Sequence, residues 1–420
     1  MNQLKMPYTG PIAGVAKTID IVDSTGVYTV PEADKGTRYL IRKSNAIADI
    51  YAIKATNAVF TRKRLTSLHF NRQDDFFLIE KGDGDEWHIL DYKDSAKNAE
   101  VRDNTGKASI MVKLERMRMS DIAPWIAPGD AKDVWSPAFY RNGKLYDYVY
   151  VSKYPNTVVS GKAYSIHYAD ATCEINFDNA KSACTSKGAG WHLMSNVEWD
   201  FLSLWSRANG TLPKGNNYAG RDIDDTSAEG DMSYAWNHTS NWNNRAYKQV
   251  SPSLFLHVGR VFNGSGPKTW YHDHDDGVWG MNGNVWEWVD GLKIVNGVAV
   301  IRNNNDIDAS EASWVNTGVN ITAGLVSGQS IKTHKTGAIP GMSGAYWDCM
   351  CIPASNNIDA PAGTIANDAF WFDATSERFP LRGGSWDYGA SAGTFALYLY
   401  HARSYVGGIV GFRAAFFCDL

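Results

Sequence analysis

The chain has 420 residues, of which 44% are hydrophobic and 20% charged, and its formal net charge at pH 7 is -4. This composition is typical of a folded protein rather than a disordered one, and the length predicts two or three domains. The weak negative charge gives no reason to expect nucleic acid or an anionic membrane as a partner.

The cysteines and the first residues bear on the cellular compartment. Five cysteines, few and odd in number, include no CxxC pair, so we expect neither a disulfide framework nor a structural zinc site. The start, MNQLKMPYTGPIAG, lacks the charged and then apolar segments of a signal peptide, and no apolar run approaches a membrane span. We therefore expect synthesis in the cytoplasm, no signal peptide and no membrane association.

Residues 1–115 are expected to form a β-rich N-terminal domain. Runs rich in β-branched and aromatic residues predict strands there, separated by turn signals such as STG and KGDGD. These runs are TIDIVDSTGVYTV, RYLIRK, DDFFLIEK and EWHILDY. The Pro- and Gly-rich segment from Ala123 to Phe139 predicts a junction, so residues 116–145 are expected to be a linker into a second domain, residues 146–420.

The second domain is expected to open on a strand within Tyr146–Thr157 and to contain two helices. One helix is predicted over Ile175–Gly188, where Gly188 supplies the stop. The other begins at Ser195, an N-cap residue with Glu198 at the capping-box position. The apolar face of the first helix carries Phe177, Ala180 and Cys184.

Residues 291–379 are a long polar insertion rich in Asn, Gly, Ser and Thr, which we expect to be an elaborated surface rather than a separate domain. After it, apolar and polar-tipped residues alternate from Phe395 to Arg403. Period two predicts a strand, with Leu397 and Leu399 facing a core and the tyrosines that alternate with them facing solvent.

Three motifs in the second domain resemble a known family. RGGSW (Arg382–Trp386) followed by GFR (Gly411–Arg413), with GNVWEW (Gly283–Trp288) upstream, resembles the formylglycine-generating-enzyme branch of the C-type-lectin fold. The resemblance covers about residues 146 to 420. It implies an α+β class, namely a C-type-lectin fold of the formylglycine-generating-enzyme type, preceded by the β-rich N-terminal domain.

The interval between RGGSW and GFR is similar to the variable region of proteins diversified by retroelements, typified by phage tropism determinants. The usual framework of that region is FALxLxxARSxxxxxIGFRAAF. Here FAL, ARS and GFRAAF stand in place, with Leu399 at its framework position and Val410 for the usual isoleucine. In that family, adenines in the asparagine codons of a template repeat are mutated during reverse transcription.

The resemblance implies that the residues between framework positions vary and bind ligand. These residues are Asp387, Tyr388, Tyr398, Tyr400, His401, Tyr405, Val406, Gly407, Gly408 and Ile409. Tyr, His, Asp, Gly and Ile are reachable from an asparagine codon by changing adenines alone, whereas Lys, Glu, Gln, Trp and Met are not and are absent here. We expect these residues other than Val406 to form one contiguous, solvent-exposed patch above four buried residues, namely Leu397, Leu399, Ala402 and Phe412.

The resemblance also bears on catalysis. The generating enzymes hold copper with a cysteine pair, and the matching positions here are Phe395 and Tyr400. Because a thiolate is needed to bind copper and to exchange with a substrate thiol, we expect no oxidase chemistry and no enzyme. Three arginines, Arg382, Arg403 and Arg413, are expected to tie neighbouring loops together rather than to bind ligand.

Two metal sites are open alternatives. Relatives bind calcium around GNVWEW, which would involve Gly283, Val285 and Glu287, although an asparagine ligand of some relatives is replaced here by Gly280. His272 and His274 in HDHDD would lie on one face of a strand and could bind a transition metal; the alternative is a solvated loop. Trp286 and Trp288 are expected to pack in the core.

These observations favour a hypervariable receptor-binding protein of a phage, located at the tail tip of the virion after cytoplasmic synthesis. Its partner would be a protein or glycan receptor on a target cell surface, its N-terminal domain would serve attachment or oligomerisation, and relatives suggest a homotrimer. One alternative is a variable protein displayed on a bacterial surface, which the missing signal peptide disfavours. Another is a sulfatase-modifying oxidase, which needs the absent cysteine pair. The third is a calcium-dependent lectin, which needs a carboxylate and amide cluster that we do not find.

Overall fold

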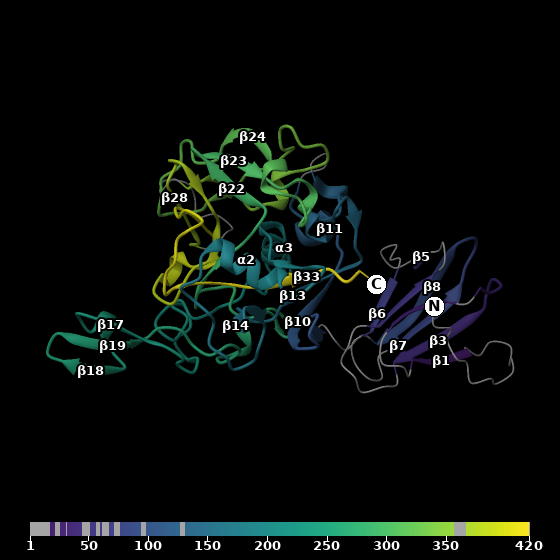
Figure 1. Cartoon of the computed structure of the whole chain (residues 1–420), viewed down its shortest axis with the longest axis horizontal. Helices are drawn as coiled ribbons and strands as arrows, with labels where there is room; N and C mark the ends of the chain where they lie inside the picture. Colours follow the sequence, from purple (N-terminus) through teal and green to yellow (C-terminus); the bar gives the residue numbers. More distant parts are fainter. Residues whose placement is uncertain are drawn as a thin grey trace.

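The computed structural model describes residues 17–21, 26–30, 32–43, 51–55, 59–60, 67–70, 76–93, 98–126, 131–356 and 367–419. Over these residues the chain is built mainly of β-sheets, with few helices (Figure 1). No helix in the described part of the chain is long and apolar enough to cross a membrane.

The N-terminal part forms two sheets that lie to one side of the molecule, on the right in Figure 1. One sheet has the order β1 (Lys17–Ile21), β3 (Arg38–Lys43), β7 (Phe76–Lys81), β8 (Glu86–Lys93) and β5 (Val59–Phe60). The other has the order β2 (Gly26–Val30), β4 (Tyr51–Ala55) and β6 (Ser67–Phe70). The described residues of all four runs predicted as strands form strands, and alternate residues such as Ile41 and Ile79 are buried. Residues 22–25 and 74–75 of these runs lie outside the described residues.

The expected domain boundary at residue 115 is wrong. A five-stranded sheet of the second domain has the order β16 (Trp191–Leu193), β33 (Ala414–Phe416), β13 (Tyr148–Ser152), β10 (Ala108–Glu115) and β9 (Asn98–Arg102). Two strands assigned to the first domain thus pair with strands of the second, with Val112 opposite Val151. The boundary lies before β9, because a strand pattern says nothing about which sheet the strand joins.

The expected linker, residues 116–145, is also wrong. It forms helix α1 (Met119–Ile122), the short 3-10 helices η2 (Ala131–Asp133) and η3 (Pro137–Phe139), and the hairpin of β11 (Tyr140–Arg141) and β12 (Lys144–Leu145). Met119, Ile122 and Phe139 are fully buried in the core of the second domain. Pro137 begins η3, and Gly143 lies in the turn between β11 and β12 with φ of 71°, so the described part of this segment is packed rather than a flexible connection.

Both predicted helices are present. Helix α2 (Phe177–Thr185) buries Phe177, Ala180 and Cys184, as expected. Helix α3 (Asn196–Ala208) begins with the predicted capping box, in which Glu198 N donates to Ser195 Oγ at 3.3 Å and Ser195 N donates to Glu198 Oε2 at 2.8 Å. The backbone amides of Ser195 and Glu198 have no partner within the helix, and these two hydrogen bonds pair both of them inside the core. They therefore fix the start of α3.

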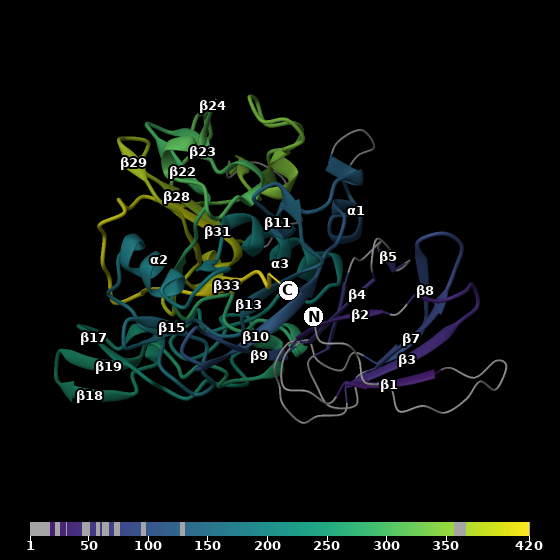
Figure 2. The same ribbon diagram turned by 45° about the vertical axis from the view of Figure 1, so that its right-hand side comes forward.

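A six-stranded sheet carries the sequence motifs. Its order is β25 (Gln329–Ser330), β28 (Ala369–Phe372), β31 (Gly393–Leu399), β30 (Leu381–Gly383), β21 (Trp286–Trp288) and β32 (Val410–Phe412). Strand β21 of GNVWEW pairs antiparallel with β30 of RGGSW and parallel with β32 of GFR. Figure 2 shows β28 and β31 between the sheet formed by β22 to β24 and the helices α2 and α3. The three motifs are therefore neighbours in space.

The polar insertion contributes strands and shares the core. Strands β24 (Val315–Asn320), β23 (Val298–Ile301), β22 (Leu292–Val295) and β29 (Glu377–Arg378) form one sheet, and β26 (Thr333–His334) pairs with β27 (Pro353–Ser355). Its buried Ile294, Ile301 and Ile321 join the same hydrophobic cluster as α3, so the insertion is part of the second domain, as expected.

Three smaller elements complete the second domain. Strands β14 (Thr157–Val159) and β15 (Lys162–Tyr164) form a hairpin, and β20 spans His272–Asp275. Strands β17 (Ala235–His238), β19 (Leu254–Val258) and β18 (Lys248–Ser251) form a sheet that extends from the body, at the left of Figure 1.

Candidate functional site

The alternating pattern in the last part of the chain holds as far as Leu399, where β31 ends. Leu397, Leu399 and Phe412 are fully buried, as expected, and Tyr400 is 49% exposed. Beyond Leu399 the chain bends and turns, so Ala402, which we expected to be buried, is only half-buried. The strand is thus shorter than the pattern predicted, because alternation continues by chance into the turn.

Rings from three segments stack into one continuous surface. Tyr388, Tyr398, Tyr400, His401 and Tyr405 belong to the predicted variable positions, and Trp371 comes from β28. We call these six residues the aromatic surface. The ring centroids of Tyr398 and His401 are 5.0 Å apart, and those of His401 and Tyr405 are 3.4 Å apart with nearly parallel planes. Trp371 contacts both Tyr388 and Tyr398.

A buried tryptophan supports this surface from below. Trp286, only 1% exposed, has its ring centroid 5.1 Å from that of Tyr388, 5.2 Å from that of Tyr398 and 5.5 Å from that of Trp371. Trp288 is also fully buried, so both tryptophans of GNVWEW pack in the core, as expected. Because edge-to-face aromatic contacts fix ring orientation as well as burying area, Trp286 sets the positions of the rings above it.

The other predicted variable residues surround the rings. Asp387 is exposed and its carboxylate accepts from Ser385 Oγ at 2.7 Å, and Val406 is 52% exposed. Ile409 is half-buried against the cluster of Trp386. The loop that contains the two glycines is held by Arg260 Nη1, which donates to Gly408 O at 2.9 Å, and by Glu174 N, which donates to Gly407 O at 3.0 Å.

The expectation that the predicted variable positions other than Val406 form a solvent-exposed patch is only partly met. Asp387, Tyr400 and Val406 are exposed. The remaining positions are half-buried, because the rings cover one another and the loop backbone is bonded to neighbouring segments; they are Tyr388, Tyr398, His401, Tyr405, Gly407, Gly408 and Ile409. The rings are therefore a prepacked platform rather than a set of free side chains.

The arginines Arg382, Arg403 and Arg413 tie segments of the chain together, as expected from their donor geometry. Arg413 is fully buried, pairs with Glu287, and donates to Ser152 O at 3.3 Å and Trp279 O at 3.2 Å. Arg382 is fully buried with Asn196 and Asp200. Each planar fork thus joins segments that are far apart in the sequence.

Arg403 fixes the loop that carries the second half of the predicted variable residues. It pairs with Asp178 on α2 and with Glu311 in the insertion. Its backbone carbonyl also accepts from Phe177 N at 3.1 Å. The loop after β31 is therefore tied to two elements that do not belong to the variable region.

The predicted metal ligands are not gathered as either of the two metal sites would require. Both carboxylate oxygens of Glu287 accept from Arg413, so the donor set around Gly283 and Val285 does not fit calcium. His272 is buried and its Nδ1 accepts from Val278 N at 2.6 Å, whereas His274 is exposed. The two imidazoles therefore do not share a face. Among the described residues, no group of three or more His, Cys, Asp and Glu could hold a metal ion.

Sequence reasoning missed Trp371. It lies in the region that we interpreted as an insertion, yet β28 runs parallel to β31 and places Trp371 opposite Tyr398. The aromatic run AFWF (residues 369–372), shortly before RGGSW, was the signal that could have found it. Glu174, which lies beside the variable loop through its bond to Gly407, was missed because it precedes a helix far away in the sequence.

The electrostatic setting keeps Tyr388, Tyr398 and His401 uncharged near neutral pH. Burial raises the pKa of Tyr398 well above its ordinary value, and burial together with Asp387 raises the pKa of Tyr388. Burial, and then the nearby Arg378, lower the pKa of His401 to about 4. The phenols therefore keep their protons and can donate hydrogen bonds, while the neutral imidazole stacks on Tyr405.

A pH dependence follows from His401. Its folded pKa of about 4 lies below the ordinary value of 6.5, so the unfolded chain binds the proton first as the pH falls. The stability from the neutral ring is complete above pH 6.5 and is lost between pH 6.5 and about 4. We expect His401→Phe to make the fall in unfolding free energy between pH 7 and 5 smaller, by less than about 1 kcal/mol because solvent screens this half-buried ring. Urea denaturation of both proteins at the two pH values measures this difference, and equal falls would contradict it.

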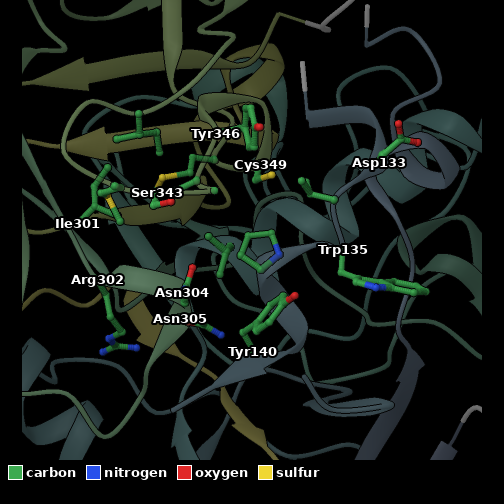
Figure 3. Close-up of a pocket in the computed structure, with 18 residues that line it drawn as sticks. Asp133, Trp135, Tyr140, Ile301, Arg302, Asn304, Asn305, Ser343, Tyr346 and Cys349 are labelled. Carbon is green, nitrogen blue, oxygen red and sulfur yellow. The ribbon is translucent and has the colours of Figure 1, made fainter. Parts of the chain in front are cut away.

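A cavity of about 340 Å³ lies elsewhere in the second domain. Figure 3 shows Tyr140 and Trp135 on one side of it and Tyr346 and Cys349 on the other. None of the predicted variable residues lines it. The cavity is therefore separate from the aromatic surface.

Comparisons with known proteins add little to this picture. No protein-family model matches the chain, and no curated protein matches its sequence. Among solved structures, PvdO from Pseudomonas aeruginosa is similar at 14% identity and a TM-score of 0.29, over 74% of this chain and 94% of that one. The Major Tropism Determinant M1 variant is similar at 12% identity and a TM-score of 0.29, over 92% of this chain and 84% of that one. At these TM-scores neither likeness carries an argument about function.

Proposed function

We propose that this chain is a hypervariable receptor-binding protein, diversified by a retroelement, that binds a cell-surface target through the aromatic surface and the residues around it. In this proposal residues 98–419 adopt a C-type-lectin fold of the formylglycine-generating-enzyme type. The protein belongs to the tail tip of a phage virion, is a homotrimer, and binds without catalysis. The N-terminal sheets serve attachment or oligomerisation.

One observation carries the proposal. The rings of Tyr398, Tyr400, His401 and Tyr405 contact one another, and Tyr388 joins them through Trp371 and Trp286. All five residues stand at positions that the proposal takes as variable. Framework residues such as Leu397 and Leu399 are buried beneath them. Substitutions at the ring positions therefore change the surface while the core stays the same. Tyrosines held in a rigid frame suit binding because they give large contact area at low entropic cost.

The genetic part of the proposal is tested by sequencing. The genome that encodes this chain should contain a reverse transcriptase and a near-copy of the region coding for residues 382–413. That copy should carry asparagine codons at the ten variable positions. Clones from a growing population should differ at those codons and agree at the framework codons. A population without a near-copy, or with changes spread evenly over the framework, would contradict diversification by a retroelement.

The binding part is tested by removing two rings. We expect Tyr400→Ala with Tyr405→Ala to weaken binding of the labelled full chain to cells that the wild type stains by at least about 30-fold, because one aromatic anchor contributes about 2 kcal/mol. The control is Tyr247→Ala, a tyrosine that is 63% exposed on the protruding sheet. It should leave staining unchanged. Unchanged staining by the double variant, with both variants folded, would place the binding site elsewhere.

A further inference from the structure

Arginines beside the aromatic surface have ion-pair partners, whereas some of the carboxylates beside it have none among the described residues. Every arginine beside it is ion-paired: Arg378 with Asp373, Arg260 with Asp170, and Arg403 with Asp178 and Glu311. These cations are therefore neutralised within the chain. Positive charge is thus not available to attract an acidic ligand to this surface.

Two carboxylates at the edge of the surface have no such partner. Asp387 and Glu174 are both exposed, and among the described residues no cation forms an ion pair with either. Asp387 precedes the ring of Tyr388 in the chain. Glu174 has its backbone amide bonded to Gly407 O, two residues beyond Tyr405. One negative charge therefore lies next to Tyr388 in the chain, and the other lies beside the loop that follows Tyr405.

A third exposed carboxylate, that of Asp224, follows a residue that packs close to Tyr388 in the chain. Asp224 is exposed and likewise forms no ion pair with a described residue. Its neighbour Ile223 packs against Gly389, one residue after Tyr388. Asp224 and Glu174 do not belong to the variable positions, so part of this negative charge is a constant feature of the scaffold.

The electron-rich faces of aromatic rings and unpaired carboxylates both attract a cation. A Lys ammonium or Arg guanidinium is attracted to the negative face of an aromatic ring, and more strongly when a carboxylate lies beside it. We infer that the aromatic surface recognises a protein receptor by a Lys or Arg side chain presented on it. The carboxylates would accept hydrogen bonds from the hydroxyls of a neutral glycan, but such a glycan brings no positive charge to offset theirs. An acidic glycan would be repelled, so the charges favour a cationic side chain of a protein. This inference rests on the proposed function and specifies the chemistry of its partner.

The experiment uses the full chain and two labelled peptides, a decalysine and a decaglutamate, with maltohexaose as a neutral glycan. We expect fluorescence anisotropy to show binding of decalysine that weakens as salt rises from 20 to 150 mM, because exposed charges are screened. Decaglutamate and maltohexaose should not bind. Preference for either of them over decalysine would overturn the inference, and preference for the glycan would favour a sugar receptor.

Matched variants separate a site from a general charge effect. Asp387→Asn with Glu174→Gln should reduce decalysine affinity at least about five-fold. Glu32→Gln with Asp85→Asn changes the net charge equally at exposed positions of the N-terminal sheets and should leave the affinity unchanged. Equal losses in the two double variants would reduce the effect to net charge and overturn the inference. Cell staining that needs the tyrosines but ignores both carboxylates would overturn the inference while leaving the proposed function intact.

Discussion

Glu287→Leu is expected to lower the free energy of unfolding of the second domain by about 3–5 kcal/mol, because it leaves a buried guanidinium without its counter-charge. Arg413 and Glu287 are both fully buried, and the pair links strand β21 to the residue that follows β32. Desolvation of an unpaired ion inside the core is the dominant cost. Urea denaturation followed by tryptophan fluorescence measures the change.

Two control variants separate the cost of leaving a buried charge unpaired from the cost of breaking an ion pair in general. Glu287→Leu combined with Arg413→Met should recover part of the loss, since removing both charges removes the unpaired ion, although Ser152 O and Trp279 O then lose a donor. Glu100→Gln breaks a surface pair with Arg102 whose side chains are 49% and 44% exposed, and should cost less than about 1 kcal/mol. A loss for Glu287→Leu as small as that for Glu100→Gln would show that the buried pair contributes little.

Trp286→Ala should destabilise the domain by about 3–5 kcal/mol and also weaken target binding, because the ring fills the core directly below the aromatic surface. The space left by the missing Trp286 ring would leave Trp371, Tyr388 and Tyr398 without the side chain that all three contact. Trp286→Phe keeps an aromatic ring there and should cost less in both measurements. Thermal unfolding and cell staining of the two variants test this.

Trp386→Ala serves as the comparison for this prediction. Trp386 is buried like Trp286 but packs with Ala171 and Val285 below Ile409 instead of below the rings. We expect a similar loss of stability and a smaller loss of binding. If both alanine variants lost stability and binding in the same proportion, general unfolding rather than ring support would explain the loss of binding.

Local structure followed directly from residue patterns. The capping box at Ser195 and Glu198 needs only residues three apart, so the start of α3 was predictable. The four N-terminal runs, the apolar face of α2, and the burial of Leu397 and Leu399 depend on periodicity within a few residues. The resemblance of RGGSW and GFR to a framework predicts which positions between them vary, and five of those positions carry rings of the aromatic surface.

Long-range pairing was decided only by the tertiary structure. Strands β9 and β10 look like any other strands, and only their partner β13 shows that they belong to the second domain. Trp371 joins the aromatic surface because β28 lies beside β31, and the role of Glu287 depends on Arg413, 126 residues away. The spacing of residues in the sequence predicts contacts between residues a few positions apart. It does not predict which distant residues or strands become partners when the chain folds.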